Sequence, residues 1–315
     1  MSNNSYFAVD TSNYTTSVAF YKNSEITQLK KLLPVKKGEL GLRQSDAVFH
    51  HTIQLPQLVE ELSNKISLKD ITAVGASFTP RSAKGSYMPC FTVGSGFARS
   101  ISSVLNVPLY RFSHQQGHIA SAIYSSGNLN LFNKKHLAFH ISGGTTEALI
   151  VTPDKNNILN ATLVGKTLDL NAGQLVDRVG VMLGLQFPCG KHIEKLALGF
   201  SEKINVKPTL KGCDCCLSGV QNICEKMYKN NVSPEEISAY VLKYIEKTLF
   251  KMTLNIFDEY GKMPVLFSGG VMSNSIIREN LTKTLGAYFA QPEFSADNAA
   301  GIAVLTALKN KEDLL

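Results

Sequence analysis

Three short turns, each rich in glycine or hydroxyl residues and each placed after a buried-type strand, most constrain how this chain can fold. The first, TSNYTTS, follows YFAVD; the second, SGGTT, follows HLAFHI; the third, SGGV, follows MPVLF. Short strands separated by helical patterns indicate an α/β architecture. The first two turns each lead into a returning strand, so each half of the chain is predicted to open with a hairpin.

Two halves that open in this way predict the actin-like fold shared by sugar kinases and Hsp70-type ATPases, with two duplicated lobes around a nucleotide cleft. In that fold the backbone N–H groups and hydroxyls of the turns hold phosphates. Ordinary tight turns are the alternative explanation of the glycines. We predict an N-terminal lobe over residues 1–128, a C-terminal lobe over 129–296, and a last helix over 297–315 that returns to the first lobe.

The composition limits the class of protein. A length of 315 residues suits two domains, and 32 Lys+Arg against 25 Asp+Glu give a net charge of +7. This charge favours an anionic partner such as a nucleotide, RNA or an acidic protein, although it is dispersed along the chain. The sequence shows neither a secretory signal nor an apolar run long enough to span a membrane. We expect a cytoplasmic protein with no membrane contact and with reduced cysteines.

Two histidines in HQQGH are the strongest candidates for metal ligands. His114 and His118 are four residues apart on a predicted helix, so both imidazoles project from one face. This spacing suits a divalent transition metal, with ordinary core or surface histidines as the alternative. Asp297, expected to begin the last helix, could supply a third ligand or could simply cap that helix. Gln115 stands where a zinc peptidase of the HExxH type has its glutamate base, which argues against peptidase chemistry.

Three further carboxylates could take part in a site. Asp10 ends the first strand and could orient water or a metal near phosphates, or could shape the turn. Asp169 and Asp177 straddle the predicted start of a helix; Asp169 could cap that helix or contact a ribose, and Asp177 could take part in the site or form a surface pair with Arg178. The cysteines of CDCCLSGVQNIC, at residues 213–224, lack the separated pairs of a structural zinc site, which favours packing at a turn over metal binding.

Eight motifs in order carry a resemblance that spans nearly the whole chain. They are FAVDTSNYTTSVAFY, HHTIQLPQLVEEL, NVPLYRFSHQQGHIASAI, HISGGTTEALIV, GKTLDLNAGQLVDRVGVMLGLQFPCGKHIEKLA, LSGV, LFSGGVMSNSIIRENL and FSADNAAGIA. On these motifs the chain resembles the TsaD-type tRNA N6-threonylcarbamoyladenosine transferases. That family was once called O-sialoglycoprotein endopeptidase or glycoprotease, of the peptidase M22 class.

The resemblance implies a reaction and a site. The family moves an L-threonylcarbamoyl group from its adenylate to N6 of adenosine 37 in tRNAs that read ANN codons. By resemblance, one iron or zinc ion would bind His114, His118 and Asp297, and we predict Asp10 and Asp297 as the catalytic carboxylates. The implied partners are the adenylate, tRNA and a TsaB-like accessory subunit. The implied residues that bind the adenine nucleotide or acyl-adenylate are Gly143, Gly144, Asp169, Gly190, Gly269, Gly270 and Asn274. We predict that Ser142, Thr145, Gly173 and Asp177 bind it as well.

Departures from the family pattern leave other functions open. Tyr14 and Thr15 occupy positions where bacterial members usually have an acidic pair, Leu170 and Gln174 replace further acidic positions, and Thr145 often corresponds to His. These changes suggest a divergent paralogue. The alternatives are a non-catalytic nucleotide-binding subunit that regulates a partner and a carbamoyltransferase with a non-tRNA acceptor. A kinase would share the fold but needs a carboxylate base that the sequence does not place.

Overall fold

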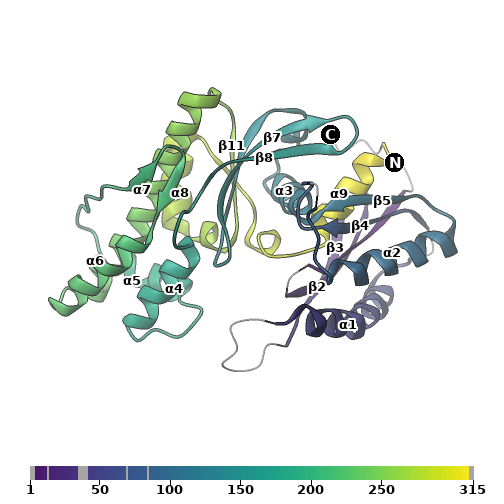
Figure 1. Ribbon diagram of the computed structural model, residues 1–315, viewed down its shortest axis with the longest axis horizontal. Coiled ribbons are helices and arrows are strands. Elements are labelled where there is room, and N and C mark those ends of the chain that lie inside the picture. Colours follow the sequence, from purple (N-terminus) through teal and green to yellow (C-terminus); the bar gives the residue numbers. More distant parts are fainter. Residues whose placement is uncertain (1–3, 13, 35–41, 69, 84, 312–315) are drawn as a thin grey trace. The chain divides into compact units, whose positions relative to one another are not determined.

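The structure is a computed structural model that describes residues 4–12, 14–34, 42–68, 70–83 and 85–311. The chain divides into two compact units. The first comprises Met1–Asn133, Pro153–Asn160 and Ala296–Leu315, and the second comprises Lys134–Thr152 and Ala161–Ser295. Each unit contains one five-stranded sheet that mixes parallel and antiparallel pairs and is covered by helices (Figure 1). The α/β class predicted from the sequence is therefore confirmed.

The sheet of the first unit has the strand order β3-β2-β1-β4-β5. The predicted hairpin is present, because β1 and β2 pair antiparallel with Asp10 opposite Ser17. Sequence patterning did not indicate β3, whose mostly polar residues form an edge strand. The strands are β1 (Ser5–Asp10), β2 (Thr15–Lys22), β3 (Glu25–Leu32), β4 (Ile71–Thr79) and β5 (Leu109–Ser113).

Helices cover both faces of this first sheet. The helices α1 (Gln44–Lys65) and α2 (Phe91–Leu105) share one buried cluster with β1, β2 and β4. The helices α3 (His114–Ser125) and α9 (Ala300–Lys309) pack on each other, and α9 contacts the sheet from the face of Gly75. A short 3-10 helix, η1 (Leu129–Asn133), follows α3.

Two helix boundaries differ from the predictions. The apolar spacing of residues 52–66 predicts a helix there, but the observed helix, α1, begins earlier, at Gln44, and Pro56 lies inside it. The last helix begins at Ala300 rather than at Asp297, and its N-cap residue is Ala299. Helix capping by Asp297 was therefore a wrong alternative, and its carboxylate is available for other contacts.

The sheet of the second unit has the order β12-β11-β6-β7-β8. Its hairpin is also confirmed, because β6 and β7 pair antiparallel around the SGGT turn. β11 runs parallel to β6 with Ser268 beside His140, so the second and third glycine turns leave the sheet at the same end. The strands are β6 (His136–Ile141), β7 (Thr146–Asp154), β8 (Ile158–Lys166), β11 (Val265–Ser268) and β12 (Tyr288–Phe289).

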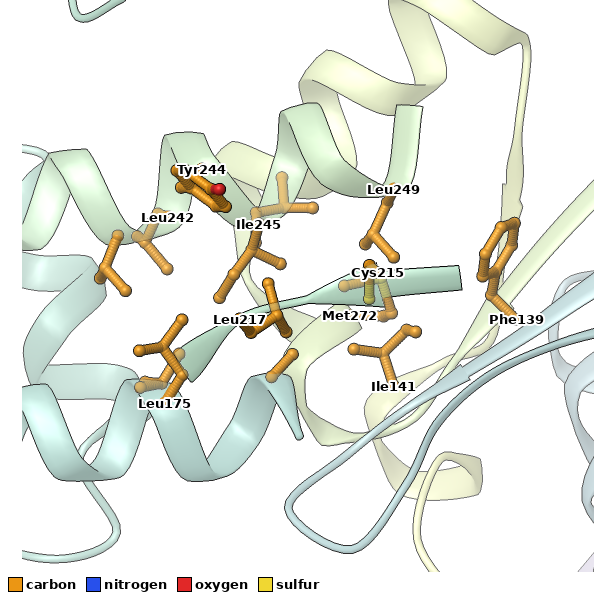
Figure 2. Close-up of a cluster of buried hydrophobic side chains, with 14 of the residues drawn as sticks. Phe139, Ile141, Leu175, Cys215, Leu217, Leu242, Tyr244, Ile245, Leu249 and Met272 are labelled. Atoms are coloured by element: carbon orange, nitrogen blue, oxygen red, sulfur yellow. The ribbon is translucent and has the colours of Figure 1, made fainter. Parts of the chain in front are cut away.

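A large apolar core holds the helices of the second unit together. Figure 2 shows Cys215 within this core beside Leu217, Leu249 and Met272. Cys215 lies on a strand rather than in the turn that the sequence suggested. The remaining elements are α4 (Ala172–Met182), α5 (Gly190–Ala197), β9 (Thr209–Lys211), β10 (Asp214–Cys216), α6 (Ser218–Lys229), α7 (Pro234–Tyr260), η2 (Gly270–Ser273), α8 (Ser275–Leu285) and η3 (Pro292–Phe294).

Among the described residues, every helix is too short or too polar to cross a membrane.

Candidate functional site

The first turn of α3 is fixed by a capping box. The Ser113 hydroxyl accepts a hydrogen bond from the backbone N–H of Gln116, and the Gln116 side chain accepts one from the backbone N–H of Ser113. The amide of Gln116 also donates to the carbonyl oxygens of Asn157 and Leu159. These bonds set the direction in which His114 projects from the end of β5.

Three side chains of the first unit converge as the sequence predicted. His118 Nε2 lies 3.0 Å from Oδ1 of Asp297, and His114 Nε2 lies 3.4 Å from the same oxygen. The three potential ligand atoms all lie within 4.8 Å of one another. Asp297 reaches the histidines because it directly precedes α9, which packs closely on α3.

Asp10 makes a contact that sequence reasoning did not foresee. Its Oδ2 lies 2.8 Å from Nδ1 of His114, and its Oδ1 accepts a hydrogen bond from the backbone N–H of Ser12. Burial opposes a charge on His114, but the carboxylates of Asp10 and Asp297 outweigh it and raise the pKa of His114 to about 10. Burial also opposes a charge on Asp10, yet His114 lowers the pKa of that carboxyl. The pair therefore links the end of β1 to the start of α3.

The residues present fit a divalent transition metal. An Asp10 carboxylate that accepts the Nδ1–H of His114 directs Nε2 of that imidazole toward Asp297, and a metal ion would displace the Nε2 proton to bind there. Two imidazole nitrogens and one carboxylate oxygen form a donor set that suits zinc or iron(II). Within the described part of the chain, His114, His118 and Asp297 are the one cluster of His, Cys, Asp or Glu with metal-binding spacing. The cysteines of residues 213–224 do not form such a cluster.

The second unit contains a cavity of about 850 Å³. This volume suits a ligand of nucleotide size. Glycine turns, the first turn of α5 and the residues before α8 supply its walls. Six of the eleven residues predicted to bind a nucleotide line it: Gly143, Gly173, Asp177, Gly190, Gly270 and Asn274.

Close backbone packing explains why glycine is required at two of the predicted positions. The Gly173 N–H donates to the carbonyl oxygen of Ser142, and a Cβ at Gly173 would lie 2.5 Å from the nitrogen of Gly143. Gly269 has a φ of +98°, and a Cβ there would lie 2.3 Å from the carbonyl oxygen of Ile141. The start of α4 and the third turn therefore sit directly on the end of β6.

Five predicted residues do not line the cavity. The turn residues among them have structural roles; the Ser142 hydroxyl, for example, accepts a hydrogen bond from the Thr145 N–H. Asn274 does line the cavity, and its side chain also caps α8 by accepting from the Ile277 N–H. The five residues outside the cavity lining are Ser142, Gly144, Thr145, Asp169 and Gly269.

Asp169 and Asp177 make contacts other than those predicted. Asp169 accepts hydrogen bonds from the N–H groups of Leu217 and Ser218 and from the Ser218 hydroxyl. It therefore caps α6 rather than the helix that follows it in sequence, where capping was expected. Asp177 accepts from the Cys189 N–H, and an ion pair with Arg178 is absent among the described contacts.

Sequence reasoning missed several residues of the cavity wall. Phe187 is 69% exposed beside the cavity, and Lys191 and His192 lie in the first turn of α5. Glu194 lines the same cavity and accepts a hydrogen bond from the Ser275 N–H at 2.7 Å. All of these wall residues belong to the motif FPCGKHIEKLA, in which only Gly190 is predicted from the sequence to bind a nucleotide.

The chain matches one family model and several named proteins. The family model TsaD, described as tRNA N6-adenosine threonylcarbamoyltransferase, matches residues 31–304. The chain is 30% identical over 288 residues to the tRNA N6-adenosine threonylcarbamoyltransferase of Staphylothermus marinus, covering 87% of this chain and 80% of the relative. It is 28% identical over 314 residues to the protein of that name from Thermosipho africanus, covering 94% and 91%.

Similarity to solved structures concerns the fold alone. Component A of the (R)-2-hydroxyglutaryl-CoA dehydratase of Acidaminococcus fermentans matches with a TM-score of 0.60 at 13% identity, covering 98% of this chain and 99% of that one. Full-length HypF matches with a TM-score of 0.59 at 15% identity, covering 97% of this chain and 55% of that one. Both have the actin-like ATPase fold, and the predicted fold is confirmed.

Proposed function

The chain belongs to the TsaD family of tRNA N6-adenosine threonylcarbamoyltransferases, and on that basis we propose that it transfers a threonylcarbamoyl group from an adenylate to N6 of adenosine 37 in tRNAs that read ANN codons. The observation that carries the proposal is the convergence of His114, His118 and Asp297, with Asp10 behind His114. These three residues would hold one iron or zinc ion, which supplies Lewis-acid polarisation of the carbonyl group under attack.

The neighbouring residues prepare the histidines for this role. Asp10 holds the proton of His114 at Nδ1, which keeps Nε2 as the ligand atom and increases its basicity. The amide of Gln115 cannot act as a general base, and Gln116 is engaged in the capping box and with two carbonyl groups. The site therefore supports group transfer and not peptide hydrolysis of the HExxH type.

The cavity of the second unit would bind the adenosine part of the adenylate. Gly143 and Gly270 present backbone without side chains, so phosphate oxygens could approach their N–H groups. Phe187 offers an exposed aromatic face on which a base could stack. In the transfer, N6 of the acceptor forms a bond to the carbamoyl carbon, the bond from that carbon to the phosphate oxygen breaks, and AMP leaves as N6 loses a proton.

A specific observation favours a second candidate, in which the acceptor is not tRNA. The positions of the acidic pair in the first turn hold Tyr14, which is 37% exposed, and Thr15, which is buried in β2. Neither side chain can take the proton from an attacking amine at neutral pH. A different acceptor, or a regulatory role without turnover, would not need that base.

One reconstitution experiment separates these functions. The purified chain is loaded with iron(II) or zinc, mixed with threonylcarbamoyl-adenylate and an ANN-reading tRNA, with and without TsaB-type accessory subunits, and the digested nucleosides are measured by mass spectrometry. We expect threonylcarbamoyladenosine from the wild type, none from His118→Ala, and normal yield from Gln115→Ala as a control on the same helix.

The other outcomes identify the alternatives. Release of AMP without modified tRNA would contradict the tRNA acceptor and support another one. No consumption of the adenylate under any condition, by a chain that binds metal and nucleotide, would overturn the transferase proposal in favour of a regulatory subunit.

A further inference from the structure

Most of the net positive charge of the chain arises in one segment that lacks acidic residues, because the rest of the chain has nearly equal numbers of basic and acidic residues. Between Asp70 and Glu147 the sequence contains no Asp or Glu, although these residues make up 25 of the 315 in the whole chain. The charge is therefore less dispersed than composition alone suggests. This segment forms β4, α2, β5, α3 and η1 of the first unit and β6 of the second. Its cationic residues are Arg81, Lys84, Arg99, Arg111, Lys134 and Lys135.

Two arginines of this segment converge on one aromatic ring. The guanidinium carbon of Arg99, on α2, lies 5.6 Å from the centroid of the Phe78 ring, and that of Arg111, on β5, lies 5.0 Å from it. The register of β4 and β5 places Arg111 beside Ala76, so Arg111 and Phe78 share one face of the sheet. Phe78 is half-buried, whereas both arginines are exposed.

Packing alone does not account for this arrangement. One arginine over an aromatic ring is common, about one such pair per 70–80 residues, but two on one ring bring like charges together. Within the described residues, neither Arg99 nor Arg111 forms an ion pair with a carboxylate. A guanidinium stacked on a ring keeps its N–H edge free, and that planar edge matches two oxygens of a phosphate.

We propose that Arg99 and Arg111, stacked on Phe78, form a docking surface for the phosphate backbone of RNA. This inference rests on the proposed function, in which the RNA is the tRNA acceptor. Arg111 precedes His114 by three residues at the end of the edge strand β5, which places their Cα atoms about 10 Å apart. The arginines lie on the α2 face of the sheet and α3 lies with α9 on the other face, so one RNA would have to pass around the edge strand β5 to contact the arginines while its target nucleotide lies at the histidines.

The surroundings favour RNA over an acidic protein. The exposed side of α2 next to Arg99 carries Ser103, whose hydroxyl is a typical phosphate donor, and Ser100, whose hydroxyl donates to the carbonyl oxygen of Gly96. Neither α2 nor β5 contains an acidic residue, which would repel a polyanion. A surface with cationic and hydroxyl groups and no acidic ones suits a backbone of repeated phosphates.

The test is the salt dependence of tRNA binding by the full chain, measured by fluorescence anisotropy with an ANN-reading tRNA. The variants are the double substitution Arg99→Gln with Arg111→Gln, and Arg43→Gln, an exposed arginine of the same unit that lies outside the Phe78 cluster. Each lost phosphate contact lowers the slope of log K against log salt by about 0.7–0.9. We therefore expect the double variant to lose about 1.4–1.8 of slope and to bind about 40-fold more weakly at 0.1 M salt.

A second double variant, Arg99→Lys with Arg111→Lys, keeps both positive charges but loses the planar guanidinium groups, which can donate two parallel hydrogen bonds to one phosphate. We expect its affinity to lie between those of the wild type and the glutamine variant, with most of the slope retained. Because both arginines are exposed, we expect every variant to keep the circular dichroism spectrum and melting temperature of the wild type. Binding of the adenylate should also stay unchanged, since the cavity proposed for its adenosine lies in the second unit.

Other results would overturn the docking surface. One such result is a tRNA affinity of the double glutamine variant that equals that of the wild type or falls no further than that of Arg43→Gln. Another is a double variant that keeps its affinity for tRNA and loses affinity only for an accessory protein. The proposed function is tested separately by nucleoside analysis. If the wild type binds tRNA through the arginines but modifies no adenosine, the docking surface is supported and the proposed function is contradicted. If tRNA is modified equally well with and without the arginines, the proposed function is supported and the docking surface is contradicted.

Discussion

The Oδ2 atom of Asp10 lies 2.8 Å from Nδ1 of His114, so a buried carboxylate at the end of β1 determines which nitrogen of the imidazole faces Asp297. The two residues are 104 positions apart in the sequence. The sequence suggested that Asp10 acts on water or a metal near phosphates. Its contact with His114 instead makes Asp10 a positioning residue, which acts through the imidazole.

Asp10→Asn should weaken metal binding without removing any metal ligand. The amide cannot supply the negative charge that makes His114 a better donor, and loss of such an outer partner typically lowers metal affinity 10- to 100-fold. Competition with a chelator of known affinity measures this change. Glu61→Gln, which removes an exposed carboxylate from α1, is the control and should bind metal as the wild type does. Equal affinities for Asp10→Asn and the wild type would refute the positioning role.

The crossing of α3 and α9 predicts a sharp difference between two glycine substitutions. A Cβ at Gly301 would lie 1.8 Å from the carbonyl oxygen of Gly117, so Gly301→Ala must push the two helices apart. We expect a loss of about 1–3 kcal/mol of unfolding free energy, and weaker metal binding because Asp297 moves with α9. Gly96 on α2 has open space around its Cβ position, so Gly96→Ala should be neutral or stabilising.

Denaturant titrations with metal analysis would measure both substitutions. Comparable effects from Gly301→Ala and Gly96→Ala would mean that α3 and α9 are not packed as described.

Asp169 should contribute stability that depends on pH. Burial works against its charge, but the Ser218 hydroxyl and the N–H groups of Leu217, Leu170 and Ser218 outweigh burial and lower the pKa of Asp169. A lowered pKa stabilises the folded state above the ordinary carboxyl pKa, and this contribution disappears as the pH falls through the lowered value. Asp169→Asn should therefore cost about 1 kcal/mol at pH 7, as for other helix caps, and less below pH 4.

Urea unfolding at pH 7 and pH 3 would measure the difference between the Asp169→Asn variant and the wild type. If the variant instead kept full stability but lost nucleotide affinity, the ribose contact predicted from the sequence would be correct and the capping role wrong.

The clustered cysteines should differ in reactivity. Burial raises the pKa of Cys215 to about 12 and that of Cys224 to about 12, so almost none of either thiol is ionised at pH 8. Iodoacetamide should leave both unlabelled in the folded protein and label both after unfolding, whereas half-buried Cys216 should react more readily. Peptide mapping by mass spectrometry reads this directly. Rapid labelling of Cys215 in the native state would contradict its place in the core.

The parts of the fold that follow local patterns could be predicted from the sequence. Both hairpins were identified because a buried-type strand, a small polar turn and a returning strand occur consecutively. The convergence of His114 with His118 also follows from helical spacing alone. By contrast, β3 is a polar edge strand and carries no alternating pattern from which it could be recognised.

The parts of the site that depend on long-range contacts could not be predicted in this way. The carboxylate of Asp169 caps a helix that begins 49 residues later, whereas sequence reasoning considered only the next helix. The partner of Asp10 is equally remote. Asp297 was predicted as a metal ligand or as a helix cap, and its place three residues before the start of α9 became clear only in the structure.

The metal centre is tested most directly by the amount of iron or zinc that the purified chain binds and by the location of that ion in anomalous diffraction. We expect one ion per chain, with His114, His118 and Asp297 as its ligands, and less than a tenth of that amount in the His114→Ala, His118→Ala double variant. An ion bound elsewhere, or equal metal content in the double variant, would contradict the metal centre on which the proposed transfer depends.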